Sequence, residues 1–396
     1  MPLSLKDRLK AVDRPEKPRD AGKTAPAFSC YHEEALFPFR DLAGVPSNQL
    51  VSGHALRLML GCEAPENIDF RKILYLDTET TGLSGGAGTI AFLVGAGYFT
   101  EEGFLVHQWL MRDYPEERFM LTALLAMLDG FDMVVTFNGK TFDLPLLQSR
   151  LLMNRMGTGA LDRVFHADLL HPARRVWKLR LKSCRLARLE EEIFHQPRED
   201  DLPGSEAPER FFRYLKTGDF SLLTDVLRHN RQDIVSLAKL MDRLLDTFEK
   251  PEQQSFFEDI FSVGRALERQ GETELARRCY HLVTEGGVRE QARLKLGKSF
   301  VRCRELDSAI EVYRHMIVCR EGGLTPYVEL AKLYEHRQKD IKNALEITEM
   351  AIFVASEPSL RTQNAMQEDQ NALQYRYMRL LKKAQAVNRF KEARRK

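Results

Sequence analysis

The chain has 396 residues, of which 43% are hydrophobic and 29% charged, and its formal net charge is +2. This composition excludes an intrinsically disordered chain, and the length favours two domains. We expect no membrane association and a cytoplasmic location, because no apolar run reaches the roughly 18–20 residues of a membrane helix, the N-terminus has no apolar signal segment, and the six cysteines are scattered without a CxxC pair.

A pattern of strands and helices begins at about residue 71. Residues 1–70 are expected to form a leader rich in proline and charge, then a segment whose short apolar pieces pack on the edge of the next domain. Buried strands are predicted at 73–77, 89–99, 104–111, 133–137 and 163–167, and helices at 115–131 and 142–153. Helical patterning continues to about residue 248. Three successive strands followed by alternation with helices predict an α/β domain at 71–250, with a mixed sheet flanked by helices.

Positive charge is concentrated in two stretches. Between Arg174 and Arg188 seven residues are Lys or Arg and none is acidic, and eight more basic residues lie between Arg379 and Lys396. Such stretches can follow a phosphate backbone, although a solvated helix face is the alternative for either one alone. Trp177, inside the first stretch, could stack on a base, but a packed core aromatic is the commoner outcome.

A helical repeat emerges after Pro251 and predicts a second architecture for residues 251–396. Small residues recur 33 and 35 residues apart, each followed four residues later by a residue that can fill the groove between paired helices. The pairs are Ala276 and Tyr280, Ala309 and Tyr313, and Ala344 and Thr348. The period is close to the 34 residues of tetratricopeptide (TPR) repeats. We predict an all-α, TPR-like helical-repeat domain with a basic tail; an ordinary helical bundle is the alternative.

Four carboxylates in three separate segments carry the functional signal. Asp77 and Glu79 end the first predicted strand, and alternate residues of a strand point to the same side. Two close carboxylates raise each other's pKa unless a cation offsets their charge, and Mg²⁺ or Mn²⁺ prefers oxygen ligands. Asp143 follows the fourth strand, and Asp233 is expected to open a helix. Taken singly, Asp143 could be a helix cap, and Asp233 a first-turn acid with Asn230 as the cap.

The segments DTETTG, NGKTFD and HNRQD, in this order, resemble the three exonuclease motifs of the DEDD superfamily. With the stretch DLLHPARRVWKLRLKSCRLARLE, they are most similar to its YprB-type branch, in which TPR-like repeats follow an RNase H-like domain. A lone Asp-x-Glu pair says little, whereas three motifs in order are specific. The resemblance covers residues 70–248 as the catalytic domain, and the repeats fit the same architecture.

The resemblance implies a site with two divalent cations, Mg²⁺ or Mn²⁺. The implied metal ligands are Asp77, Glu79, Asp143 and Asp233. Asp77 would bridge the two ions, Glu79 and Asp233 would help hold the ion that activates water, and Asp143 would hold the ion near the leaving oxygen. The implied catalytic set is these four carboxylates together with His229.

Residues next to the motifs are implied to bind substrate. Thr80, Thr81 and Gly82 would place hydroxyl and backbone groups near the terminal nucleotide. Asn138, with Gly139, would shape the turn that presents Asp143.

His229 departs from the family pattern. Family members carry His five residues before the last Asp or Tyr four residues before it, and here a His stands at the Tyr spacing. Residues i and i+4 share a helix face, so His229 is expected beside Asp233, where an imidazole suits a general base near neutral pH. A helix-end His without a chemical role is the alternative.

Together these features predict a metal-dependent 3′→5′ exonuclease, a hydrolase of phosphodiester bonds, with DNA favoured as the nucleic-acid substrate. The resemblance implies DNA repair with a helicase partner, and the TPR-like array would bind a protein partner or extend the nucleic-acid track. One alternative is a ribonuclease acting on RNA 3′ ends, because recognition of the ribose 2′-OH depends on site geometry that motifs do not fix. The other is a non-catalytic scaffold that only binds nucleic acid, against which the four retained carboxylates argue.

Overall fold

The computed structural model describes residues 29–42, 50–82, 88–198, 202–356 and 367–395. Nearly all of the predicted leader lies outside these residues. No helix among them is long and apolar enough to cross a membrane.

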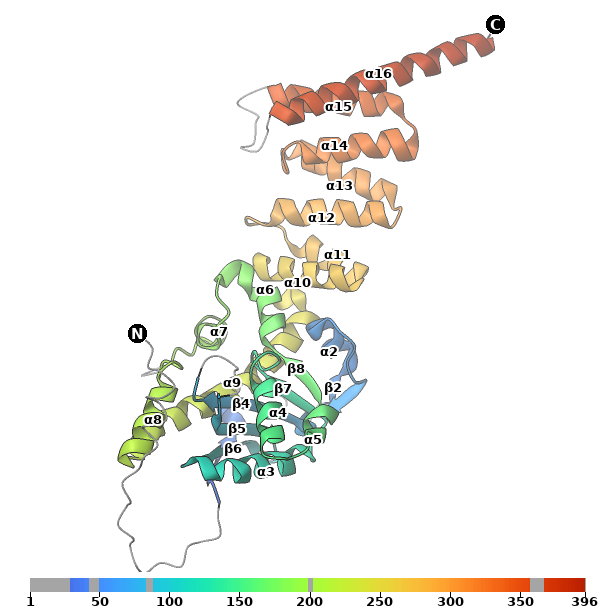
Figure 1. Cartoon of the computed structure of the whole chain (residues 1–396). Helices are drawn as coiled ribbons and strands as arrows, with labels where there is room; N and C mark the ends of the chain where they lie inside the picture. The colour runs from blue at the N-terminus through green and yellow to red at the C-terminus, as the bar shows by residue number, and fades with distance from the viewer. Residues whose placement is uncertain (1–28, 43–49, 83–87, 199–201, 357–366, 396) are drawn as a thin grey trace, which may run out of the picture.

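A six-stranded mixed sheet forms the centre of the N-terminal part (Figure 1), which confirms the predicted fold class. In spatial order the strands are β1 (Tyr31–Pro38), β6 (Gly103–Leu110), β5 (Ala91–Phe99), β4 (Ile73–Thr80), β7 (Met133–Thr136) and β8 (Phe165–Asp168). The pairs from β1 to β4 are antiparallel, whereas β4, β7 and β8 run parallel. The edge strand β1 comes from the segment 31–70, so the sheet uses residues N-terminal to the expected start at 71.

Helices cover both faces of the sheet. One face packs on α9 (Ser221–Glu249), α2 (Gly53–Leu60), α6 (Leu170–Leu181) and α7 (Leu186–Ile193). The other packs on α3 (Glu117–Leu128), α4 (Asp143–Met153), α5 (Gly159–Arg163), α8 (Ala207–Thr217) and the start of α9. Beside α2 lies a two-stranded sheet of β2 (Leu50–Ser52) and β3 (Asn67–Asp69). Apolar side chains at alternate strand positions supply both cores.

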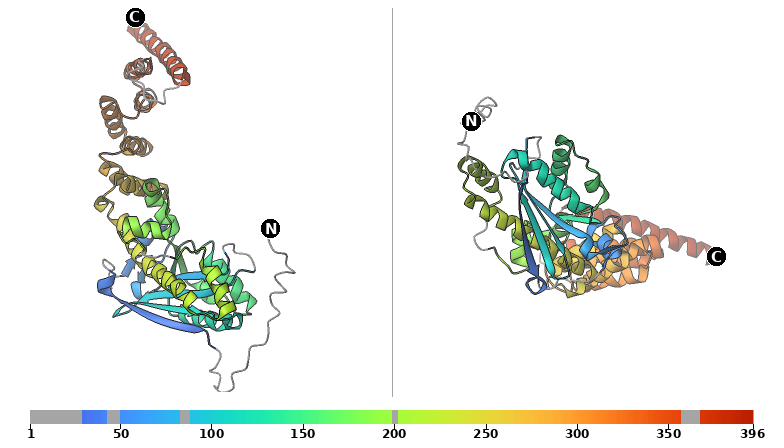
Figure 2. Two further views of the ribbon diagram at one scale, coloured as in Figure 1. Left: turned by 90° about the vertical axis from the view of Figure 1, so that its left-hand side faces the viewer. Right: turned by 90° about the horizontal axis from the view of Figure 1, so that it is seen from below.

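The remaining helices form an arm that projects from the sheet domain (Figures 1 and 2). They are α10 (Phe257–Gln270), α11 (Thr273–Leu282), α12 (Arg289–Arg302), α13 (Leu306–Val318), α14 (Thr325–Lys332), α15 (Ile341–Ser356) and α16 (Gln367–Arg395). A π-helical turn, Leu333–Gln338, follows α14. A Cβ on Gly264 would lie 2.9 Å from a ring carbon of Tyr280, and one on Gly297 2.7 Å from a ring carbon of Tyr313. Glycine at these two positions therefore permits the close approach of α10 to α11 and of α12 to α13.

The arm and the sheet domain share one hydrophobic core. The cluster that contains the α9 face of the sheet continues through α6 into α10, α11 and α12. Arg180 on α6 donates to Asp259 on α10 at 2.7 Å, and its guanidinium lies 4.0 Å from the centre of the Phe256 ring. The boundary predicted near residue 250 falls between α9 and α10, yet the core crosses it.

Candidate active site

Asp77 and Glu79 lie on the face of β4 that packs against α9. Asn230 on α9 donates from Nδ2 to Asp77 Oδ2 at 2.8 Å. Gly95, the β5 partner of Asp77, makes room for this contact, because a Cβ there would lie 2.1 Å from Asn230 Oδ1. His229 Nε2 is 3.9 Å from Glu79 Oε1. The strand alternation expected from the sequence therefore places both carboxylates beside the helix that carries the third motif.

Asn230 positions Asp77, and the alternative in which Asn230 caps a helix that begins near Asp233 is wrong. It lies inside α9, which begins at Ser221, and it is fully buried. Its Oδ1 accepts from Gln108 Nε2 at 2.8 Å, while its Nδ2 donates to Asp77. Asp233 is likewise in the middle of α9 and does not open a helix. The apolar residues at 223, 226 and 227 pack on the sheet and extend the helix upstream of the motif.

Asp143 is the first residue of α4 and is buried next to β4. Its Oδ1 accepts from Thr78 Oγ1 at 2.5 Å. The turn before it has Asn138 in a left-handed conformation, with φ of 70°. At Gly139 a Cβ would lie 2.4 Å from Thr136 Oγ1, so only glycine fits. The geometry thus places Asn138 and Gly139 in the turn that leads to Asp143.

Asp168 fixes this turn and was not assigned a role from the sequence. Its carboxylate accepts backbone N–H groups of Asn138 at 2.8 Å, Lys140 at 3.1 Å and Leu170 at 3.0 Å. Asp168 ends β8, next to β7, so an acid at the carboxyl end of a neighbouring parallel strand was the available signal.

Asp233 and His229 face the same site from adjacent turns of α9. His229 Nε2 is 3.7 Å from Asp233 Oδ2, as the i, i+4 spacing predicts. Arg198 reaches both residues: its Nη2 donates to Asp233 Oδ1 at 2.5 Å, and its Nη1 is 3.2 Å from His229 Nδ1. Arg198 also pairs with Glu190 of α7. Sequence reasoning missed both Arg198 and Glu190, which precede the third motif by more than thirty residues.

Thr80, Thr81 and Gly82 form a hydrogen-bonded turn after β4. Thr80 Oγ1 donates to the Gly82 carbonyl at 2.8 Å, and Thr81 Oγ1 accepts from Ile90 N at 3.0 Å. Both threonine hydroxyls are therefore engaged within the protein. Their contact with a nucleotide stays a prediction.

The carboxylates lie in an environment that opposes their charge. Burial raises the pKa of Asp77 well above its usual range, and the charges of Asp233, Asp143 and Glu79 raise it further. Burial likewise raises the pKa of Asp143 to about 6 and raises that of Asp233. Burial alone would lower the pKa of Arg198, but its hydrogen bond with Glu190 and the charge of Asp233 raise it, so Arg198 stays cationic. Arg198 divides its single positive charge between Glu190 and Asp233, so it does not neutralise all the carboxylates of the site, and bound cations could offset the remaining negative charge.

The donor set suits hard divalent cations. All four motif side chains offer carboxylate oxygens, the ligands that Mg²⁺ and Mn²⁺ prefer. Among the described residues the four carboxylates do not bring three ligand atoms within 4.8 Å of one another. Ligands of one Mg²⁺ lie within about 4.2 Å of one another, because each bond is about 2.0–2.1 Å long, so ion binding would require these side chains to draw together.

A basic pocket adjoins the turn of the second motif. Its volume is about 520 Å³. It is lined by Phe137, Asn138, Leu170, Arg174, Lys178, Lys182, Ser183, Cys184, Arg185 and Leu186. Four of the Lys and Arg residues in the predicted basic stretch thus line one pocket with Asn138. Trp177, in the same stretch, is 1% exposed and packs in the core, which is the expected alternative to base stacking.

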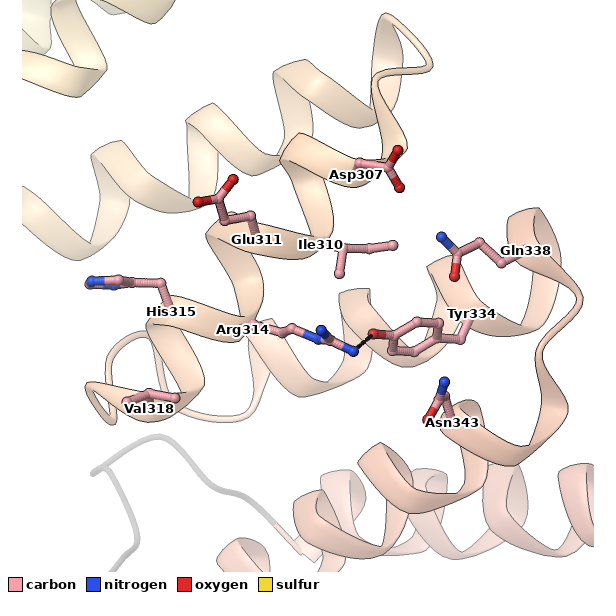
Figure 3. A pocket seen from close by; sticks show the side chains of 9 residues that line it. All are labelled: Asp307, Ile310, Glu311, Arg314, His315, Val318, Tyr334, Gln338 and Asn343. Atoms are coloured by element: carbon pink, nitrogen blue, oxygen red, sulfur yellow. Dashed lines mark hydrogen bonds between the residues drawn. The ribbon is translucent and has the colours of Figure 1, made fainter.

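A second hollow, of about 560 Å³, lies on the arm between α13 and the turn after α14 (Figure 3). Arg314 points across it and donates to the Tyr334 hydroxyl at 2.5 Å. Asp307, Glu311 and His315 line the same hollow, so its wall carries both signs of charge.

Comparison with known proteins supports an RNase H-like fold for the sheet domain. Residues 74–245 match a family model described as the RNase_H superfamily. The uncharacterized protein YprB of Bacillus subtilis (strain 168) is 29% identical over 334 residues, which are 81% of this chain and 78% of YprB. The family B DNA polymerase of the hyperthermophilic archaeon Pyrobaculum calidifontis matches 50% of this chain and 29% of its own, with 14% identity and a TM-score of 0.36, too low to support an argument.

Proposed function

We propose that this chain, in which residues 74–245 match the RNase_H superfamily model, is a metal-dependent 3′→5′ exonuclease that hydrolyses phosphodiester bonds at nucleic-acid ends. The observation that carries the proposal is the convergence of four motif carboxylates from β4, α4 and α9 on one buried site. Two observations support a common site: the charges of Asp233, Asp143 and Glu79 all raise the pKa of Asp77, and His229 lies 3.9 Å from Glu79 and 3.7 Å from Asp233.

Asp77, Glu79, Asp143 and Asp233 would hold the metal ions. A pair of Mg²⁺ or Mn²⁺ ions supplies the charge that stabilises the attacking and leaving oxygens in phosphoryl transfer. The residues around the carboxylates keep them in place. Asn230 orients Asp77, and Thr78 holds Asp143 by hydrogen bonds.

His229 is our candidate proton acceptor. Its Nε2 points toward Glu79 and Asp233, at 3.9 and 3.7 Å, so it borders the space where an attacking water would stand. Its Nδ1 contacts Arg198. A guanidinium can only donate hydrogen bonds, so this contact favours the His229 tautomer in which Nδ1 carries no proton and accepts the bond. That tautomer would carry a proton on Nε2 when neutral. Release of Arg198 from His229 would therefore be needed before Nε2 could accept a proton.

The basic pocket is our candidate substrate track. Its Arg and Lys side chains lie beside the turn that presents Asp143, and such side chains hold a phosphate backbone without reading its sequence. DNA is the favoured substrate, with a role in DNA repair in the cytoplasm. The TPR-like arm would bind a protein partner, such as a helicase. A ribonuclease acting on RNA 3′ ends is the second candidate, because hydrolysis of RNA would use the same four carboxylates and the same metal chemistry.

The test is degradation of end-labelled DNA and RNA oligomers with Mg²⁺, Mn²⁺ or EDTA. We expect metal-dependent release of mononucleotides from DNA 3′ ends, and loss of this activity in Asp77→Asn. Faster degradation of RNA would favour the ribonuclease. Binding without cleavage under every metal condition would leave the non-catalytic scaffold.

A further inference from the structure

Three potential metal ligands lie on the sheet face opposite the candidate active site. The register pairs Glu33 on β1 with Gln108 on β6, and both contact Arg231 of α9. Because side chains alternate along a strand, the next residues, Glu34 and His107, point away from α9. They are also register partners. His32, two residues before Glu34, shares their face, so the group is separated from the catalytic carboxylates by the sheet itself.

The ligand atoms of these residues form a compact triangle. His107 Nδ1 lies 3.2 Å from His32 Nε2 and 3.2 Å from Glu34 Oε1, and His32 Nε2 lies 3.7 Å from the same oxygen. Bonds of about 2.0–2.2 Å around a tetrahedral Zn²⁺ separate neighbouring ligand atoms by roughly 3.3–3.6 Å. The three distances therefore match one face of such a tetrahedron. Within the described parts of the chain, this is the only group of three His, Cys, Asp or Glu ligand atoms within 4.8 Å of one another.

Ring stacking fixes the two imidazoles. His107 lies parallel to Tyr98 and to Trp109, each with centroids 5.7 Å apart, and His32 lies parallel to Trp109 at 5.4 Å. A metal-binding His is usually oriented by a hydrogen bond at its other nitrogen. His107 is only 8% exposed, and its Nε2 is buried with no hydrogen-bond partner among the described residues. The rings of Tyr98 and Trp109 orient the His107 imidazole instead, and its Nδ1 faces His32 Nε2 and Glu34 Oε1.

We propose that His32, Glu34 and His107 bind a transition-metal cation of the Zn²⁺ class and that this cation cross-links the edge strand β1 to β6. Two imidazoles and one carboxylate form a three-ligand set that Zn²⁺ takes with water in the fourth position. Imidazole nitrogen disfavours Mg²⁺, whereas the catalytic site offers only oxygen. The His32–Glu34–His107 site and the candidate active site therefore differ in the metal ions they prefer as well as in their position on the sheet. Since β1 is an edge strand that pairs only with β6 in the six-stranded sheet, the cross-link would hold β1 in register with β6.

The test is Zn²⁺ and Co²⁺ binding to tag-free, full-length protein stripped with EDTA and then supplied with excess Mg²⁺. We expect one Zn²⁺ per chain by competition with a chromophoric chelator, and the intense visible bands of tetrahedral Co²⁺. His32→Ala should weaken Zn²⁺ binding by at least about 100-fold, since loss of an outer-shell partner alone costs about 10–100-fold. Zn²⁺ should raise the Tm of the wild type in proportion to occupancy, and leave that of His32→Ala unchanged.

His54→Ala is the matched control, because His54 is an exposed histidine on α2 and should leave Zn²⁺ binding intact. Glu34→Gln is a second test variant, nearly isosteric and exposed, which should fold normally and lose affinity. Equal Zn²⁺ binding by the wild type, His32→Ala and Glu34→Gln would overturn the site. Tight binding that leaves the wild-type Tm unchanged would overturn the cross-link. Asp77→Asn should retain Zn²⁺ binding, so failure of the exonuclease proposal is detected independently.

Discussion

Replacing Asp143 with Asn should stabilise the metal-free protein at neutral pH while abolishing cleavage. Asp143 is buried at the start of α4, where burial raises the pKa of its carboxyl to about 6 from the usual 3.8. Its Oδ1 accepts from Thr78 Oγ1, and an Asn Oδ1 can accept the same hydrogen bond. The substitution therefore removes the charge and keeps the shape.

The magnitude follows from the two pKa values. Below pH about 4 the carboxyl is protonated in the folded and the unfolded chain, so it makes no difference to stability. As pH rises from about 4 to about 6 the unfolded chain releases a proton that the folded chain retains, and the wild type loses stability. At about 1.4 kcal/mol per pH unit, the interval from 3.8 to about 6 corresponds to about 3 kcal/mol at most, because part of the effect is shared with the neighbouring carboxylates.

The assay is urea unfolding of wild type and Asp143→Asn in EDTA, across the range from acid to neutral pH. The stability advantage of the variant should be small in acid and grow toward about 3 kcal/mol at neutral pH. Mg²⁺ at about 100 times its Kd should add about 2.7 kcal/mol to the wild type and much less to the variant. Glu63→Gln, at an exposed loop carboxylate, controls for charge removal as such. An advantage that does not change with pH would refute the burial argument.

Four further outcomes are expected. Asp77→Asn, Glu79→Gln and Asp233→Asn should each reduce cleavage by orders of magnitude with unchanged circular dichroism, and near-normal activity at saturating Mg²⁺ would remove that residue from the ligand set. His229→Ala should slow cleavage by roughly 10²–10⁴-fold, whereas an unaltered rate and pH profile would leave it a structural role. Closed circular single-stranded DNA should resist the enzyme, and rapid cutting would indicate an endonuclease. A chain ending at residue 250 should unfold at lower temperature than one ending at residue 285, because it exposes the apolar surface where α6 meets α10; equal Tm values would mean that this contact contributes little.

The sequence predicts the sheet and the carboxylates because their signals are local. The apolar run 73–76 continues directly into Asp77, and alternation alone puts Glu79 on the same side. The predicted contact between His229 and Asp233 is also correct, although the predicted start of the helix is wrong. The contact requires only that residues i and i+4 lie on the same helix.

The residues that were missed act across long sequence separations. Arg198 meets Asp233 from 35 positions away, and Asp168 holds the turn at Asn138 from 30 positions away. Nothing near Arg198 in the sequence indicates its partner, and for Asp168 the one signal is its position at the carboxyl end of a strand parallel to β7. The edge strand β1 was equally hidden, because its exposed and half-buried positions alternate without a fully apolar face.

Helix α6 gives the molecule a fixed geometric reference. Its outer positions, Arg174 and Lys178, line the basic pocket, and Arg180 near its end holds α10 and thereby the arm. One helix therefore connects the basic pocket beside the candidate active site to the arm, and it fixes the orientation of the arm relative to that pocket. Because each residue of an α-helix adds a rotation of about 100°, a single insertion between Lys178 and Arg180 would turn Arg180 away from α10 relative to the pocket.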